Sequence, residues 1–295
     1  MSSNWRSQQE KTNIYFLSAL WWFARMTGRT ITRATLLPLI AVSYFCLDKN
    51  ARSASRQFFE RLQGPSVPAW LVLKHFYTFA SVSLDRLYLL AGFDQMFEID
   101  MEGAELFDDL PEGAVLVTSH FGSFEIMRVL AHKHRGLLVH ILLDKKHNPS
   151  AFNIIERLDP KLASYVIDAS SPGPALIVKL SNLLERNQLV GIMGDRIEDG
   201  QRSTTKFFLG SPAEFPMGPW IIATLLKRPI ICCFGSFEGG RKYRIRFEKI
   251  DLEGIQGKSQ VRSNWALGQY VEHLESYAQQ SPLNWFNFYD FWGSS

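Results

Sequence analysis

The sequence predicts an α/β fold: a mostly parallel sheet flanked by helices and preceded by an N-terminal helical segment. Short strand-like apolar runs alternate with longer helix-like stretches from about residue 76 onward, the pattern of βαβ units. The composition, with 46% hydrophobic and 21% charged residues in 295, is that of a globular chain with a sizeable core. Disorder, collagen and coiled coil are excluded because low-complexity, repeat and heptad patterns are all missing.

The expected elements follow one another in a regular order. The strand-like runs cover residues 114–118, 137–143, 165–167, 189–193, 230–237 and 243–247. Helix-like stretches cover residues 124–134, 150–158, 174–186, 219–227 and 261–279. Ligands of such sheets bind at the carboxyl ends of the strands, so the residues just after each strand are the candidates for function.

The first quarter of the chain differs from the rest. Residues 1–75 hold ten Lys and Arg but only three Asp and Glu, so the other 220 residues carry a net charge of −4 out of a total of +3. Two uncharged stretches, residues 12–24 and 34–47, fall short of the roughly 20 residues of a membrane-spanning helix. We therefore expect a basic, aromatic membrane-associating region over residues 1–75 and an α/β domain over residues 76–295.

Three arginines support a membrane surface in that region. Arg25, Arg29 and Arg33 are spaced by four, which on one helix aligns their guanidinium groups beside the aromatic residues 21–23. Such a helix suits an anionic lipid surface. The alternative is a pair of ordinary core helices whose arginines face water. The start of the chain lacks the pattern of a cleavable signal peptide, and we take it as the mature N-terminus.

Several functions are not indicated by the sequence. Three cysteines cannot build a disulfide framework, and a charge of +3 does not indicate nucleic acid. The motifs G-x-S-x-G, G-x-x-x-x-G-K-[ST], G-x-G-x-x-G and C-x-x-C do not occur. His132 and His134 are two apart and diverge on a helix, which argues against a metal pair there. We expect no metal site, and the chemistry expected below requires no cofactor.

One histidine stands at the end of a predicted strand with a carboxylate five residues later. His120 follows residues 114–118, Gly122 permits a tight turn, and Glu125 falls in the first turn of the next helix. A carboxylate that bends back onto the imidazole fixes its tautomer, and the other ring nitrogen then acts as a base. No serine or cysteine nucleophile of recognised type lies near, so the pair suits deprotonation of a bound hydroxyl or amine that attacks an activated acyl group.

Here the chain resembles the lysophospholipid acyltransferase superfamily. Members of that superfamily carry the motif His-x-x-x-x-Asp or Glu at this place. The Glu in this motif and the Phe-Gly element look like the lipid A biosynthesis acyltransferase branch. Within it, the chain is most similar to bacterial predicted acyltransferases of glycolipid and aryl-polyene-lipid pathways. The resemblance extends over nearly the whole chain. One position differs, because relatives usually have Asn where this chain has Ser123. It rests on residues 119–125, His147, Asn153, residues 194–196, residues 208–219 and residues 284–292.

The resemblance implies roles for particular residues. His120 is the expected general base and Glu125 the expected orienting carboxylate. The expected substrate-binding residues are Arg196, Ser123, Gly122, Lys206, His147 and Gly210. Three interpretations stay open: Arg196 forms a surface salt bridge with Asp195 or Glu198, residues 210–219 form only a structural turn, and the aromatic tail 285–292 packs in the core instead of lining an acyl-chain cavity.

We thus expect an acyltransferase that uses an acyl thioester, from acyl carrier protein or coenzyme A, and a lipid or glycolipid acceptor. The implied location is the cytoplasmic face of a bacterial inner membrane. Two other functions remain as alternatives: a thioesterase or lipid hydrolase, in which His120 activates water, and a noncatalytic lipid-binding protein of a membrane pathway.

Overall fold

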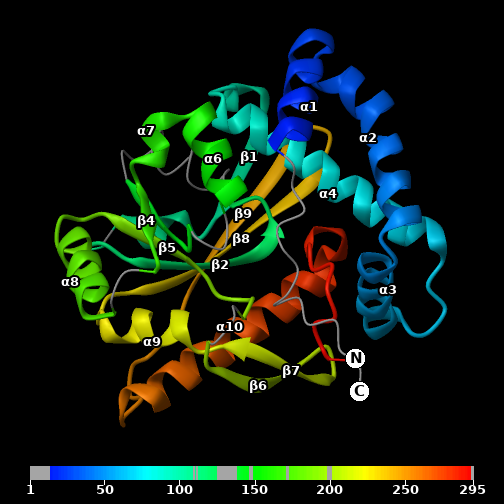
Figure 1. The fold of residues 1–295 in the computed structure, drawn as a ribbon. Helices are drawn as coiled ribbons and strands as arrows, with labels where there is room; N and C mark the ends of the chain where they lie inside the picture. Colours follow the sequence, from blue (N-terminus) through cyan, green and yellow to red (C-terminus); the bar gives the residue numbers. More distant parts are fainter. Residues whose placement is uncertain are drawn as a thin grey trace.

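A computed structural model gives the fold, and its ribbon is shown in Figure 1. The structure describes residues 14–108, 110, 112–124, 138–145, 149–170, 173–197 and 201–293. For residues 14–17, 150 and 151 the description is of the backbone alone.

The described helices and strands include most of the predicted ones, together with several that were not predicted. The predicted helix over residues 124–134 lies outside the described residues except for residue 124. The helices are α1 (Ile14–Thr27), α2 (Arg29–Leu47), α3 (Lys49–Gln63), α4 (Ala69–Leu90), α6 (Pro149–Leu158), α7 (Pro160–Ala163), α8 (Gly173–Leu184), α9 (Gly218–Leu225) and α10 (Ser259–Gln280). The strands are β1 (Glu98–Glu102), β2 (Val115–Gly122), β3 (Val139–Leu143), β4 (Val166–Asp168), β5 (Leu189–Met193), β6 (Ser203–Phe208), β7 (Ser211–Pro216), β8 (Ile230–Gly239) and β9 (Lys242–Lys249).

Seven of these strands form one sheet in the order β1-β9-β8-β2-β5-β3-β4. All neighbouring pairs are parallel except β8 and β9. The predicted fold class is therefore confirmed. Strand β2 lies between β5 on one side and β8 on the other. The chain thus changes the direction in which it adds strands at β2, and in α/β sheets a binding crevice lies at the carboxyl end of the strands at such a point.

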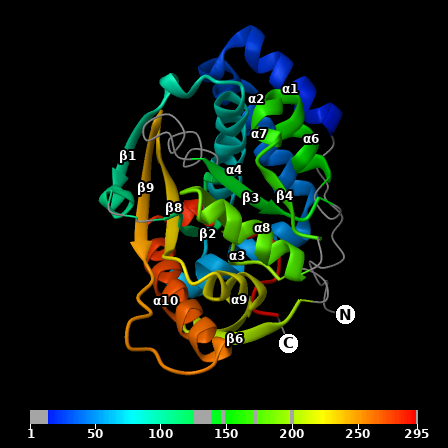
Figure 2. The ribbon, with the colours of Figure 1, turned by 90° about the vertical axis from the view of Figure 1, so that its left-hand side faces the viewer.

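Both faces of the sheet are covered, as expected for parallel strands with apolar residues on either side. In β2, Val115 and Val117 belong to one core, together with α8, α9 and α10, whereas Leu116 belongs to a second core with α1 and α2. Figure 2 shows helices on both sides of the strands. Helix α4 contributes to both cores and crosses beside the end toward which the β2 arrow points in Figure 1.

The N-terminal helices differ from the expectation of one arginine stripe. The helix breaks at Gly28, which has a φ of +83°, so Arg25 lies on α1 while Arg29 and Arg33 lie on α2. Arg25 is exposed, but Arg29 is buried in a bidentate pair with Asp85 of α4, with both N–O distances at 2.6 Å. The prediction that all three arginines face anionic lipid is wrong for Arg29.

Arg33 also turns toward the body of the protein. Its Nη1 donates to the carbonyl of Gly240 at 2.7 Å, and its guanidinium lies over the ring of Phe237 at 5.0 Å. Arg29 donates to the same carbonyl, and the hydroxyl of Tyr243 donates to Asp85 at 2.7 Å. These contacts attach α2 to α4 and to the β8–β9 hairpin. The buried charges of Arg29 and Asp85 are stable there because they are paired and hydrogen-bonded.

Two predicted boundaries fall differently in the structure. Residues 210–219, predicted as a shaped loop, form the strand β7, which pairs antiparallel with β6 before α9 begins at Gly218. Leu209 and Gly210 both have positive φ, the backbone of a two-residue hairpin turn. Helix α4 runs through residue 75, so the proposed division between residues 75 and 76 lies inside a helix, and the two-region organisation stays a prediction.

Candidate active site

The site is centred on His120, near the carboxyl end of β2. Strand β2 continues to Gly122, so His120 lies within the strand instead of in the loop after it. Its Nδ1 is 3.0 Å from Oδ1 of Asp195, and its backbone N–H donates to Oδ2 of the same carboxylate at 2.9 Å. The side chain of His120 is 32% exposed and that of Asp195 only 2%, so the pair is buried on the carboxylate side and open on the imidazole side.

The contact with Asp195 determines the tautomer of His120. Burial alone would raise the pKa of Asp195, but His120 and Arg196 outweigh it, and the net pKa is lowered. An ionised carboxylate only accepts hydrogen bonds, so we assign the imidazole proton to Nδ1. Nε2 then carries a lone pair, and it makes no hydrogen bond to any residue that the structure describes.

The charge state of His120 suits a base. Burial lowers its pKa below the ordinary value of 6.5, and the positive charges of Arg196 and Arg86 act in the same direction, while Asp195 opposes them. The imidazole is therefore neutral at pH 7, with Nε2 ready to accept a proton.

Arg196 lies next to this pair but does not form the salt bridge with Asp195 that the sequence left open, and Glu198, the other partner left open, lies outside the described residues. Its Nη2 donates to the carbonyl of Phe286 at 2.8 Å, and its guanidinium lies 5.5 Å from the centre of the Tyr289 ring. Its Nε is buried with no hydrogen-bond partner among the described residues. The guanidinium nevertheless places a permanent positive charge beside His120, where it can stabilise negative charge on a ligand.

Gly122 and Ser123 form a close contact between β2 and β8. A Cβ at Gly122 would lie 1.5 Å from the carbonyl oxygen of Gly235, and its φ is +59°, so only glycine fits. The N–H of Ser123 donates to that same carbonyl at 3.0 Å, and so it is not available to a substrate. The Ser123 hydroxyl is buried and has no partner among the described residues.

The aromatic tail packs mainly inside the protein. Trp285 and Phe291 are buried in the larger core, where Trp285 contacts the rings of Phe58 and Phe208. Stacking of this kind stabilises a core through offset and edge contacts. The core interpretation of the tail thus fits these residues.

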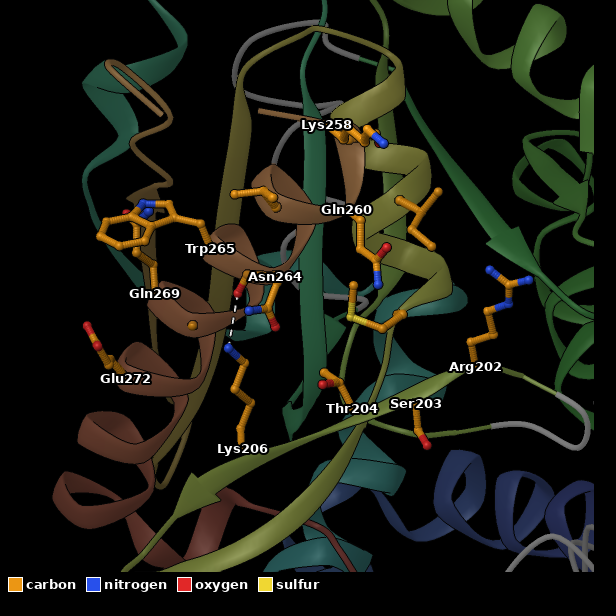
Figure 3. Close-up of a pocket in the computed structure, with 15 residues that line it drawn as sticks. Arg202, Ser203, Thr204, Lys206, Lys258, Gln260, Asn264, Trp265, Gln269 and Glu272 are labelled. Carbon is orange, nitrogen blue, oxygen red and sulfur yellow. Dashed lines mark hydrogen bonds between the residues drawn. The ribbon is translucent and has the colours of Figure 1, made fainter. Parts of the chain in front are cut away.

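Other predicted residues lie elsewhere or outside the described part of the chain. Glu125 and His147 are outside the described residues. Gly210 is the turn of the β6–β7 hairpin, and Lys206 points from β6 toward α10, where its Nζ donates to the carbonyl of Asn264 at 3.1 Å (Figure 3). The structure groups His120, Gly122, Ser123 and Arg196 at one end of the sheet, and it places Lys206 and Gly210 on the hairpin.

Lys206 lines a cavity of about 1070 Å³ between β6 and α10. Arg202, Lys258 and the half-exposed Trp265 lie along its other sides, with their side chains spread around it (Figure 3). None of the residues that line this cavity belongs to the group around His120. Among the described residues, no cluster of His, Cys, Asp or Glu could hold a metal ion.

Asp195 is the functional candidate that the sequence did not assign as the partner of His120. The signal that could have found it is strand register: Thr118 of β2 pairs with Met193 of β5, so the residues two positions later, His120 and Asp195, lie level in a parallel sheet. Sequence spacing could not reveal this, because 75 residues separate the two side chains.

The fold and the site define a class: an α/β protein with a neutral, carboxylate-supported histidine and an arginine at the carboxyl edge of its sheet. A histidine in such a setting can act as a general base. The profile of the bacterial lipid A biosynthesis acyltransferase family matches residues 90–290, more than half of the chain, and the protein belongs to that family. It is accordingly an acyltransferase of lipid biosynthesis, as the sequence predicted.

A solved structure was also compared. The 1-acyl-sn-glycerophosphate (LPA) acyltransferase PlsC from Thermotoga maritima is 13% identical, with 90% of this chain and 96% of that chain covered and a TM-score of 0.37. The search of curated proteins gave no significant match.

Proposed function

We propose that this chain transfers a fatty acyl group from an acyl thioester, carried by acyl carrier protein or coenzyme A, to a hydroxyl or amine of a lipid or glycolipid, with His120 as the general base. The observation that carries the proposal is the pair of hydrogen bonds from His120 to the buried carboxylate of Asp195. It leaves a neutral imidazole with Nε2 unprotonated at the open side of the site.

The proposed reaction has two steps. Nε2 takes the proton of the acceptor hydroxyl or amine as that group attacks the thioester carbonyl, forming a tetrahedral oxyanion. The oxyanion then collapses and the carbon–sulfur bond breaks, and the leaving thiolate receives the proton from the imidazolium. The ionised Asp195 stabilises the imidazolium between the two steps, as a buried carboxylate does for other catalytic histidines.

Arg196 is the residue that we propose to stabilise negative charge on the substrate. Of the backbone donors near His120, the N–H of His120 is used by Asp195 and that of Ser123 by Gly235. The guanidinium of Arg196 is thus the described cation best placed to stabilise the oxyanion or an anionic headgroup. Gly122 and Ser123 shape the same edge, and Glu125, His147, Lys206 and Gly210 stay predictions from the resemblance.

The test is transfer of a labelled palmitoyl group, supplied as its coenzyme A or carrier-protein thioester, to lipids extracted from bacteria. His120→Ala should abolish acylated product while the circular dichroism spectrum is unchanged. His273→Ala, a half-buried histidine of α10, is the matched control and should keep full activity. Transfer that persists in His120→Ala would overturn the base role, and free fatty acid formed equally with and without acceptor would identify a hydrolase.

We further propose that the protein lies on the cytoplasmic face of a bacterial inner membrane, attached through α1 and α2. Exposed apolar side chains gather on these helices: Trp22, Met26, Ile31, Leu39, Val42 and Leu47. Ile31, Leu39 and Val42 fall on one stripe of α2, opposite the buried Leu37 and Ala41. An apolar patch of this kind marks an interaction surface.

The contacts of α2 favour a helix that lies on the membrane over one that crosses it. Among the described helices, α2 is the one long and apolar enough to span a bilayer. However, its buried Arg29 is paired with Asp85, and its inner residues pack against α4. Crossing would break this pair and expose a charge to lipid, which is costly.

A further inference from the structure

A short segment after α10 contacts both candidate residues of the site. Phe121 and Trp285 form an antiparallel bridge, and the N–H of Phe286 donates to the carbonyl of His120 at 2.8 Å. The carbonyl of Phe286 accepts from Nη2 of Arg196, also at 2.8 Å. One residue of the C-terminal segment therefore fixes the main chain of His120 and the side chain of Arg196.

The segment is itself held from α4 by His75. Nε2 of His75 is 3.1 Å from the carbonyl oxygen of Trp285, and Nδ1 is 2.9 Å from the hydroxyl of Ser55. His75 is fully buried, and this burial lowers its pKa to about 3, so the ring is neutral and carries one proton. Because a carbonyl only accepts, that proton lies on Nε2, and Ser55 donates to Nδ1.

Strand β8 holds the same segment from the other side. The side-chain oxygen of Asn284 accepts from the N–H of Phe237 at 2.7 Å, and its Nδ2 donates to the carbonyl of that residue at 3.2 Å. The buried residues Asn284 and Trp285 are thus anchored to β8 and to α4 just before the chain reaches Phe286.

From these contacts we infer that His75 is a positioning residue for the transfer reaction, acting through Trp285 and Phe286 on His120 and Arg196. The inference rests on the proposed function. Asp195 holds the N–H of His120 and Phe286 holds its carbonyl, so the imidazole projects from a main chain fixed on both sides. If the hydrogen bonds of Phe286 are weakened, the end of β2 and the guanidinium of Arg196 can shift. A misplacement of about 1 Å can reduce a reaction rate about 100-fold.

The test compares two substitutions of His75. His75→Phe removes the N–H donor but keeps a ring among Phe58, Phe59 and Phe288. His75→Gln keeps an N–H near the position of Nε2. We expect kcat to fall about 10- to 100-fold in His75→Phe, with KM changed less, and to stay within a few-fold of wild type in His75→Gln.

A pH profile separates positioning from stability. In the wild type, the charges of Arg196 and Arg86 oppose Asp195 at His120 and help keep its pKa low. When Phe286 no longer holds Arg196, the acid limb of kcat/KM in His75→Phe should move up toward the ordinary histidine value of 6.5. A role in stability alone would lower the melting temperature and leave this limb in place.

The control is Thr224→Val, which removes a buried hydroxyl contact with Ser263 between α9 and α10, away from His120. If His75→Phe matches this control in kcat per folded molecule and in its acid limb, the inference is overturned. If His75→Phe does not fold, Asn284→Ala should show the same rate loss and limb shift, and wild-type values there would overturn it as well. Activity that survives in His120→Ala would instead refute the proposed function.

Discussion

The carboxyl edge of the sheet and the outer face of α1 and α2 use the same kinds of residue in opposite ways. At the sheet edge, polar groups point inward and are fixed: His120 has its N–H, carbonyl and Nδ1 all bonded, and Asp195 is buried. On the helices, apolar side chains such as Trp22 and Leu39 point outward, while Arg29 turns into the protein. The difference separates the region that we propose to carry out the chemistry from the region that we propose to bind the membrane.

The proposed membrane attachment should therefore depend more on apolar area than on the arginines. The sequence pattern placed Arg25, Arg29 and Arg33 toward lipid, yet two of them stabilise the junction between α2 and the body. Charge near a membrane contributes about 1 kcal/mol per group, whereas burying a large apolar side chain contributes about 1.5–3 kcal/mol. The two regions can thus be altered independently by substitution.

The largest expected effect is at the sheet edge. Asp195→Asn replaces an acceptor by an amide that can donate to Nδ1, which moves the imidazole proton to Nε2 and removes the base. We expect kcat to fall about 10³- to 10⁴-fold with vesicle binding unchanged. Acyl transfer measured beside Asp100→Asn, an exposed carboxylate of β1, checks this. A loss of less than tenfold would mean that Asp195 does not set the tautomer.

Next in size is the junction between the regions. Asp85→Leu leaves the buried Arg29 without its carboxylate and Tyr243 without its acceptor. Breaking a buried pair in this way costs about 3–5 kcal/mol, so the midpoint of urea unfolding should fall strongly. Glu102→Gln, which unpairs Arg246 at the surface, should cost less than about 1 kcal/mol. Equal losses in the two variants would show that the Arg29 pair is not a structural link.

A third substitution tests the exposed apolar face of α1 and α2 as a membrane surface. Leu39→Ser on α2 should weaken binding to vesicles of phosphatidylglycerol and phosphatidylcholine about tenfold, since one large apolar side chain no longer enters the lipid. Leu39 is 65% exposed, and Val178 of α8, at 60%, gives the matched control Val178→Ser. Sedimentation with vesicles measures both. If both variants bind as the wild type does, the face is not a membrane surface.

The smallest expected effect is in the pH dependence of the wild type. As the proposed base, His120 must be neutral. Its pKa lies below 6.5, so we expect activity to be present above that pKa and to be lost as the pH falls through it. Between pH 7.5 and 6.5, kcat/KM should therefore change less than about twofold. A drop of more than that across this interval would place the pKa above 6.5 and contradict the electrostatic account of the site.

How much the sequence predicts depends on whether a feature is local. The alternation of apolar runs with helices yields the parallel sheet, because each run carries its own signal. Strand β1 was not predicted, because three of its five residues are acidic and acidic residues are uncommon in strands. The hairpin β6–β7 was missed because its prolines and glycine indicated a loop.

The site shows the same limit. His120 and Arg196 were singled out because each follows a predicted strand, but the partnership of His120 with Asp195 requires knowing that β2 and β5 are neighbours. The spacing of Arg25, Arg29 and Arg33 was misleading because Gly28 ends the helix between the first and second of them. His75 carries no local signal, since its proposed effect passes through backbone atoms of Trp285 and Phe286, far away in the sequence.

The pair of Arg29 and Asp85 has a consequence for the geometry of the acceptor. Because it fixes α2 to α4 and to the β8–β9 hairpin, the face that we propose to lie on lipid and the histidine at the sheet edge keep a constant separation. An acceptor embedded in the bilayer must then raise its reactive hydroxyl or amine to a set height above the surface. Acceptors with the same reactive group but different headgroup lengths should consequently differ in rate, with the protein acting as a spacer that selects among them.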